Sequence, residues 1–132
     1  MKKLFISLLF LISSCVSDNK KTDHHIQEKG QGELHFINTI VKLDSVKSGD
    51  TVTANFKFTN NSNESVKIEY VNPDCVCTSF SISNENLAPN DTAYIQLNFD
   101  TKGYYGYKKV PAVVKANTRS RFYMISLIVD II

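Results

Sequence analysis

The sequence is poor in the residues that define several protein classes. It has no tryptophan, three cysteines, three prolines and five glycines among 132 residues. Three cysteines are too few for a small domain held together by several disulfides. Net charge is also low: without Lys2 and Lys3, which lie in a segment that we expect to be removed, 13 basic residues face 13 acidic ones. A chain without net charge has no basic footprint for phosphate, so we expect no nucleic-acid partner.

The residue sets of common enzymes are also missing. All three histidines stand at or before position 35, and there is no glycine-rich phosphate loop. No nucleophile, base and acid can be grouped from the sequence, and no pair of carboxylates is marked by its surroundings. We therefore expect a protein that is not an enzyme, with no catalytic residues and no resident cofactor.

The first 14 residues have the pattern of a signal peptide. A short cationic start is followed by an apolar run from Leu4 to Ile12, broken only by Ser7. As a helix this run rises only about 14 Å, roughly half of a hydrocarbon core, which disfavours a permanent span. The run ends in Leu-Ile-Ser-Ser before Cys15, and this stretch resembles the bacterial lipobox. We expect residues 1–14 to be removed and Cys15 to carry the lipid; an ordinary secretory signal with an unrelated cysteine is the alternative.

A lipid on Cys15 predicts an exported protein held on a membrane, because a diacylglyceryl group supplies the two acyl chains that stable anchoring needs. The residue after Cys15 is Val16 rather than aspartate. By similarity to sorting in Gram-negative bacteria, this favours the outer membrane.

Residues 15–33 are predicted to form the lipidated start and a flexible linker. Beyond Cys15 their only large apolar side chains are Val16 and Ile26, which are too few to offset the entropy of ordering. His24 and His25 could be metal ligands, but a linker fixes no coordination geometry, so we interpret them as solvated.

From Leu34 onward the apolar residues recur with a period of two, which is typical of strands with one buried face. The clearest strand runs from Thr51 to Thr59, and on the next strand we place Val66, Ile68 and Tyr70 on the buried face. Further strands are expected at residues 34–43, 80–82, 93–99, 110–116 and 122–131, and Pro111 is expected near a sheet edge. Seven to eight short strands without a helix predict an all-β domain at residues 34–132, an immunoglobulin-like antiparallel β-sandwich; a small β-barrel is the alternative.

The last expected strand is apolar on both faces. Tyr123, Ile125 and Leu127 lie on one face, and Phe122, Met124 and Ile128 lie on the other. We expect a loop to cover this second row, since most apolar positions of a short domain belong to its core. The alternative is a contact surface.

A short motif gives the domain a family resemblance. Cys75-Val76-Cys77-Thr78 is similar to the Cys-Gly-Cys-Thr signature that closes the third strand in domain-of-unknown-function family 1573, whose members are exported and Ig-like. Gly49-Asp50, Leu87-Ala88-Pro89 and Ala116-Asn117-Thr118 continue the pattern, which covers most of residues 43–129. The resemblance implies an interaction or scaffolding domain and carries over no catalytic residue.

Two positions depart from the family pattern. Val76 replaces the central glycine, which restricts this backbone to ordinary φ values and argues against a tight Cys-x-Cys hairpin. Asn90 replaces a turn glycine, a milder change because asparagine tolerates the left-handed region.

Cys75 and Cys77 leave several chemistries open. In an extended strand their Cα atoms would lie about 6.6 Å apart, near the upper limit for a disulfide, so a bond needs a local turn that Pro73-Asp74 could start. A structural pair, buried or locally bridged, is the first interpretation. Copper held by two thiolates, a thiol-redox pair and an intermolecular disulfide are the alternatives. His35 is interpreted as a surface residue rather than a third ligand.

Three sites match an Asp-Ser/Thr-aliphatic pattern that some Gram-negative bacteria O-glycosylate. The candidate hydroxyls belong to Ser45, Thr51 and Thr92. The same pattern arises where aspartate ends a turn and a β-branched residue begins a strand, which is our first interpretation.

The sequence thus predicts a lipid-anchored envelope protein whose sandwich binds another envelope protein or a glycan without catalysis. A copper or thiol-redox function of Cys75 and Cys77 is the alternative.

Overall fold

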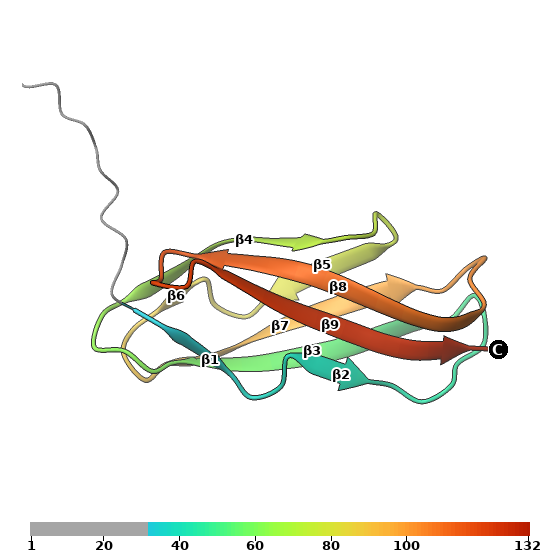
Figure 1. Ribbon diagram of the computed structural model, residues 1–132, viewed down its shortest axis with the longest axis horizontal. Coiled ribbons are helices and arrows are strands. Elements are labelled where there is room, and N and C mark those ends of the chain that lie inside the picture. The colour runs from blue at the N-terminus through green and yellow to red at the C-terminus, as the bar shows by residue number, and fades with distance from the viewer. Residues whose placement is uncertain (1–31) are drawn as a thin grey trace, which may run out of the picture.

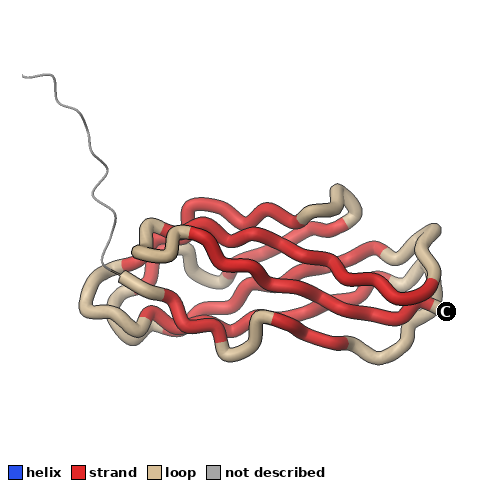
Figure 2. Tube along the Cα trace, in the orientation of Figure 1, coloured by secondary structure: helices blue, strands red, loops and turns tan. Residues whose placement is uncertain are grey.

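The computed structural model describes residues 32–132, and the predicted signal peptide, Cys15 and most of the predicted linker lie outside this range. Figures 1 and 2 show an all-β domain of two layers. No helix that could cross a membrane is found in the described part. Its strands are β1 (Leu34–Phe36), β2 (Ile40–Lys42), β3 (Thr51–Asn60), β4 (Val66–Pro73), β5 (Thr78–Ile82), β6 (Asn86–Leu87), β7 (Thr92–Asp100), β8 (Gly106–Ala116) and β9 (Phe122–Ile131).

The strands form an immunoglobulin-like sandwich, as the sequence predicts. A four-stranded sheet has the order β1-β3-β7-β5, and a five-stranded sheet has the order β2-β9-β8-β4-β6. The segment expected as one strand at residues 34–43 is two strands, because the chain crosses from the first sheet to the second between Phe36 and Ile40. Its second half, β2, pairs parallel with β9, so the five-stranded sheet is mixed rather than wholly antiparallel.

The core lies between the two sheets and follows the period of two. Along β3 the even-numbered residues from Val52 to Phe58 are buried, and they pair with equally buried residues of β7. The inner residues of β8 and β9 close the other side, with Val114 and Leu127 fully buried. Burying both apolar faces requires the second sheet, which is why the pattern yields a sandwich.

One inner position differs from the expectation. Tyr70 was predicted on the buried face with Val66 and Ile68, but it is 46% exposed and Val71 is buried instead. The register between β4 and β8 shifts between Ile68 and Tyr70. A β-bulge adds one residue to a strand and so reverses the face of everything after it.

Pro111 is not near a sheet edge, since β8 lies between β9 and β4. Its carbonyl accepts the N–H of Asp74 at 3.0 Å, immediately after β4 ends. The missing N–H of Pro111 therefore removes only the last hydrogen bond of this ladder, and an inner strand can tolerate the residue.

The sandwich has two distinct ends, which Figure 1 shows. The chain enters at Gly32, beside the β3–β4 and β8–β9 loops, and we call this the N-terminal end. The β4–β5 turn, the β7–β8 loop and the C-terminus lie at the opposite end. Because Cys75 and Cys77 belong to the β4–β5 turn, we call it the disulfide end.

Candidate functional site

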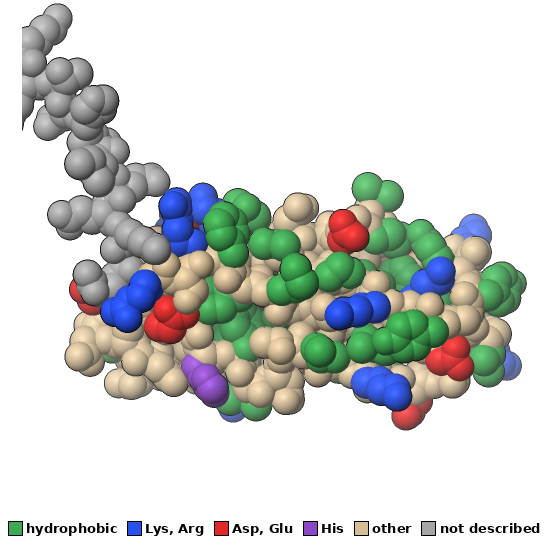
Figure 3. All heavy atoms as spheres, in the orientation of Figure 1, with side chains coloured by type: hydrophobic (Ala, Val, Ile, Leu, Met, Phe, Trp, Pro, Cys, Tyr) green, Lys and Arg blue, Asp and Glu red, His purple; other side chains and the backbone are tan. Residues whose placement is uncertain are grey.

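The outer face of the five-stranded sheet is rich in exposed apolar side chains. In Figure 3 they spread over the surface formed by β8 and β9. The most exposed are Ile40, Tyr70, Tyr107, Phe122 and Met124, which are 46–66% accessible to solvent. Val113 lies between them, since it pairs with Met124 on one side and with Asn72 on the other. These residues, with the half-buried Pro111 and Ile128, are here called the apolar face.

Part of the apolar face was predicted from the sequence, with cover by a loop as the first interpretation and a contact surface as the alternative. Phe122, Met124 and Ile128 were assigned to the outer row of β9, but the loop expected to cover them does not do so: Phe122 is 54% and Met124 61% exposed. Tyr70 was missed because the bulge in β4 changes its face. The sequence signal for this surface was the absence of polar alternation in the last strand.

Charged side chains lie among and beside the residues of the apolar face: Lys109 stands between Tyr107 and Pro111 along β8, and Lys115 pairs with Phe122. Lys42, Lys67, Lys109 and Lys115 lie on the outer side of this sheet, with Glu69 and Asp130. Lys115 forms an ion pair with Glu69 at 2.7 Å and stands 5.7 Å from the ring centre of Tyr70. The charged side chains on this side of the sheet are therefore more basic than acidic.

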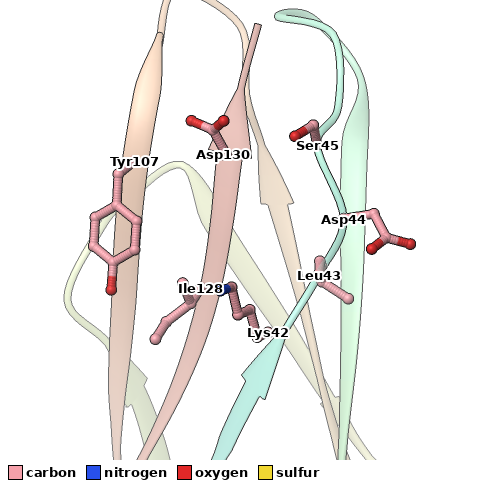
Figure 4. A pocket seen from close by; sticks show the side chains of 7 residues that line it. All are labelled: Lys42, Leu43, Asp44, Ser45, Tyr107, Ile128 and Asp130. Atoms are coloured by element: carbon pink, nitrogen blue, oxygen red, sulfur yellow. The ribbon is translucent and has the colours of Figure 1, made fainter.

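A shallow groove opens beside the apolar face, where β2 leaves β9 (Figure 4). It is lined by Lys42, Leu43, Asp44, Ser45, Tyr107, Ile128 and Asp130. Figure 4 shows Tyr107 and Ile128 on one side and the segment that carries Ser45 on the other. The groove extends the apolar face toward the disulfide end.

The outer face of the four-stranded sheet has the opposite character. Thr53 donates a hydrogen bond to Asn98 Oδ1 at 2.8 Å, and the hydroxyls of Thr59 and Thr92 lie 3.1 Å apart. These cross-strand bonds satisfy the polar side chains among themselves. Tyr94 is the exposed large aromatic on the central strand of this face.

Cys75 and Cys77 are joined by a disulfide, with their Cα atoms 5.1 Å apart. The turn that brings them together begins at Cys75 itself, whose carbonyl accepts the N–H of Thr78 at 3.0 Å. Val76 does not prevent a tight Cys-x-Cys turn, contrary to expectation, because it is not among the residues with positive φ and its side chain is fully exposed to solvent. Asn90 does adopt a left-handed φ of 66°, as expected for its turn.

Tyr104 packs against this disulfide from the β7–β8 loop. Its hydroxyl lies 3.6 Å from Cys77 Sγ and 3.7 Å from Cys75 Sγ, and its ring lies 5.4 Å from that of Phe99. Nearby, Thr78 Oγ1 is buried without a hydrogen-bond partner among the described residues. The disulfide, Tyr104 and Thr78 form a packed cap on this end of the core.

Among the described residues, the structure adds no third metal ligand to Cys75 and Cys77, and it does not test glycosylation. His35 lies on β1 and is exposed, as interpreted, and within residues 32–132 no three histidine, cysteine or acidic side chains gather as a metal site. Ser45, Thr51 and Thr92 are all exposed, so their glycosylation stays a prediction. Cys15, His24 and His25 lie outside the described residues.

The N-terminal end holds a polar cluster that sequence reasoning missed. Tyr123 donates a hydrogen bond to Glu33 at 2.6 Å and accepts one from the Leu34 N–H at 3.1 Å. Its hydroxyl is also 2.9 Å from Thr118 Oγ1. No spacing in the sequence links position 33 to position 123, so only the fold reveals this clamp at the start of the domain.

The clamp shifts both of its titratable groups. Burial first, and then the bond to Glu33, raise the pKa of Tyr123 above its ordinary value of 10.0. Partial burial opposes ionisation of Glu33, but hydrogen bonds from Tyr123 and Ser120 and the charge of Arg119 outweigh it and lower the pKa of this carboxyl below 4.5. The clamp is therefore most stable with Glu33 ionised and Tyr123 protonated.

Comparison with known proteins supports both the family and the fold. The model of the family described as "Protein of unknown function (DUF1573)" matches residues 34–131. No curated protein sequence matches the chain.

Several solved structures share the fold. A protein of unknown function from Porphyromonas gingivalis W83 has a TM-score of 0.66 at 11% identity, over 77% of this chain and 48% of that one. The chain thus spans about half the length of that protein. The PapD-like domain 7 of human CEP192 has a TM-score of 0.56 at 11% identity, over 100% and 98% of the two chains. The secreted serine protease VesC from Vibrio cholerae has 0.57 at 18% identity, but only 24% of its chain is covered.

Proposed function

The chain belongs to the DUF1573 family, and from this premise we propose that it is a lipid-anchored, non-catalytic binding module of the bacterial envelope. The apolar face is its binding surface, and another envelope protein is its partner. The protease likeness does not argue for catalysis, because it covers a quarter of the protease chain and speaks only to the fold.

The exposed apolar face is the observation that carries this proposal. Soluble domains seldom leave a contiguous group of aromatic and aliphatic side chains in water, and tyrosine, phenylalanine and methionine are enriched at protein interfaces. The hydroxyl- and amide-rich outer face of the other sheet lacks this character. A protein partner fits better than a glycan, because Met124, Val113 and Ile40 offer no hydrogen bonds to sugar hydroxyls.

The charged side chains among the apolar residues indicate which charges the partner should carry. Four lysines and two acidic residues lie on this side of the sheet. Opposite charges around an apolar centre favour encounter and fix orientation. The expected partner surface is an apolar patch that includes aspartate and glutamate.

The anchor places this surface in the envelope. Residues 15–33, which the sequence predicts to be the lipidated start and a flexible linker, would span about 20–25 Å as a coil, which is enough to hold the domain clear of lipid headgroups. The chain enters the sandwich at the end opposite the disulfide (Figure 1). The apolar face runs along the side of the sandwich, where neither end blocks it.

One experiment tests the lipid anchor, and a second tests the partner. Cells producing the wild-type chain or Cys15→Ala are grown on radioactive palmitate, and the isolated protein should be labelled only in the wild type. An unlabelled wild-type protein in the soluble fraction would disprove the anchor without touching the binding proposal.

For the partner, a photo-activated cross-linking residue is placed at Met124 or, as a matched control, at Tyr94 on the polar outer face. A reproducible adduct is expected from position 124 alone. It should be lost when Phe122→Ser is added. Equal adducts from both positions, or none from 124, would reject the apolar face as the binding surface.

The copper or thiol-redox function of Cys75 and Cys77 is the second candidate, favoured by the incomplete burial of both cysteines and the Tyr104 hydroxyl beside them. Intact mass with and without reductant, followed by Cu(I) titration of the reduced protein, tests it. A reduced protein that binds no copper and a Cys75→Ser/Cys77→Ser variant that only loses stability would reject it.

A further inference from the structure

The sandwich has four sheet edges, and they are not equally protected. β1 and β2 have three residues each and β6 has two, whereas β5 has five. Natural proteins limit unwanted strand pairing by short edge strands, lysine, proline and bulges. β1, β2 and β6 are short. The part of β4 that extends past β6 carries Glu69, a bulge and Pro73, and the part of β3 that extends past β1 carries Lys57.

β5 has none of these protections. Its sequence, Thr-Ser-Phe-Ser-Ile, has no charge and no proline. It pairs with β7 in an unbroken register from Thr78 opposite Phe99 to Ile82 opposite Ile95, without a bulge. β5 therefore offers a straight, uncharged edge over its whole length.

The ladder shows which backbone groups face outward. Asp100 N–H donates to the Cys77 carbonyl and Ser83 N–H donates to the Tyr94 carbonyl, both at 3.0 Å. In an antiparallel pair the residues that exchange such bonds alternate, so Ser79 and Ser81 also bond to β7. The N–H and C=O groups of Thr78, Phe80 and Ile82 therefore point away from β7, toward the open edge of the sheet.

Only one of these outward groups is used elsewhere in residues 32–132. The Thr78 N–H is taken by the Cys75 carbonyl, but neither Phe80 nor Ile82 donates its N–H to any described residue outside the ladder. Two donors and three acceptors are thus available on one short edge.

We propose that β5 pairs antiparallel with β5 of a second copy of this chain, around a two-fold axis at Phe80. This register places Phe80 opposite Phe80 of the second copy, and each donates its N–H to the other's carbonyl. Ile82 N–H of each copy then donates to the Thr78 carbonyl of the other. The interface makes four hydrogen bonds, and no outward N–H of β5 is left without a partner.

The side chain of Phe80 fits this arrangement. It lies on the inner side of the sheet, as its pairing with Leu97 shows, yet it is 44% exposed at the rim of the sandwich. A two-fold axis perpendicular to the sheet brings the two Phe80 rings side by side on the same face. Each would cover the other's exposed area, and aromatic cross-strand pairs add to strand pairing.

A second copy is a better partner for the β5 edge than an unrelated peptide, because β5 carries no charge with which it could select a particular peptide. The register above is self-complementary, as a two-fold interface requires. The pairing joins two four-stranded sheets into one and does not use the apolar face, so it is independent of the proposed binding function.

The interface is small, so association in dilute solution should be weak. Copies held on one membrane would meet at effective concentrations of about 1 mM, which compensates for a small contact. The experiment therefore covers concentrations up to about 1 mM, with residues 16–132 as soluble protein, since residues 32–132 close a complete core by themselves.

Sedimentation equilibrium is measured for the wild type, Phe80→Lys, Phe80→Glu and Thr53→Lys. The wild type and Thr53→Lys, which changes the outer face of a central strand, should show a monomer–dimer equilibrium. Each Phe80 variant alone should bind itself at least about tenfold more weakly, because like charges meet on the axis. An equimolar mixture of the two should dimerise again.

Cross-linking tests the register. Phe80→Cys should form an intermolecular disulfide, because directly opposed Cα atoms lie about 5.5 Å apart. Ser79→Cys should not, since position 79 opposes 81 and its own copy is roughly 8 Å away. Thermal unfolding confirms that each variant is folded. A wild type that stays monomeric at about 1 mM, charge variants that still dimerise, or equal cross-linking at 79 and 80 would overturn the proposal.

Discussion

The two outer faces of the sandwich are built on strands with the same alternation, yet they differ in chemistry. On the four-stranded sheet, Thr53 and Asn98 form a cross-strand hydrogen bond at 2.8 Å. On the five-stranded sheet, the corresponding outer positions of β8 and β9 include Val113 and Met124, which are opposed in the register. One face satisfies its own polar groups, and the other leaves apolar area in water.

This difference shows that exposure of the apolar face is not a requirement of the fold. The polar face demonstrates that threonine, asparagine and glutamine on the outer side are compatible with the same sandwich. Apolar side chains that the fold does not need are best explained by a contact. If the apolar face serves a contact, substitutions on it should change the free energy of unfolding little.

The largest effect is expected from a comparison of inner and outer phenylalanines. Phe58 is fully buried, and Phe58→Ala should lower the free energy of unfolding by about 3–5 kcal/mol. Phe122→Ala should change it by no more than about 0.5 kcal/mol. Urea denaturation of the two variants gives the measurement. A comparable loss from both would mean that the apolar face is part of the core.

The second-largest effect is expected from a comparison of two tyrosines of the five-stranded sheet. Tyr123→Phe removes the hydroxyl that bonds Glu33 and the Leu34 N–H, and should cost about 1–3 kcal/mol of unfolding free energy. Tyr70→Phe, on the outer face, should leave stability nearly unchanged and serves as the control. Equal small changes would show that the clamp contributes little.

A smaller effect is expected in the pH dependence of unfolding. The folded-state pKa of Glu33 is lowered, so its contribution is present above pH 4.5 and is lost as the pH falls through the folded pKa. The folded-state pKa of Tyr123 is raised, so its contribution is lost as the pH rises above 10.0. Glu33→Gln should flatten the acid side of the stability profile, and Tyr123→Phe the alkaline side. Unchanged profiles would contradict these shifts.

The smallest effect concerns the ion pair beside the apolar face. Lys115→Met removes the bond to Glu69 and should change unfolding free energy by about 0–1 kcal/mol, since both side chains are partly exposed. Lys57→Met, which removes a cation stacked 5.9 Å from the ring of Tyr94 on the polar face, is the matched variant. A loss of unfolding free energy well above this range for Lys115→Met alone would show that the ion pair with Glu69 stabilises the fold.

Much of the fold could be predicted because the period of two is a local property. The buried residues of β3, β7 and β9 were assigned from alternation alone. Tyr70 was assigned to the wrong face because a bulge leaves no mark in the alternation of a short strand. Residues 34–43 were expected as one strand because the crossing between sheets is decided by which strand each half can pair with.

The candidate site was less predictable. Cys75 and Cys77 were identified, but their bond depended on a turn that the sequence placed at Pro73-Asp74 and the structure places at Cys75. The cover expected over Phe122 and Met124 depended on where a distant loop runs. Ile40 and Tyr107 could not be connected to them without knowledge of the strand order.

The amino-acid sequence by itself determined the all-β class, the inner face of each regular strand and the family motif, because these depend on neighbours within a few residues. Only the tertiary structure decided which strands share a sheet, which apolar row stays in water and which edge stays open. Those outcomes depend on pairing between residues up to ninety positions apart, as in the bond from Tyr123 to Glu33. A local pattern carries no information about such pairings, since many strand orders satisfy the same alternation.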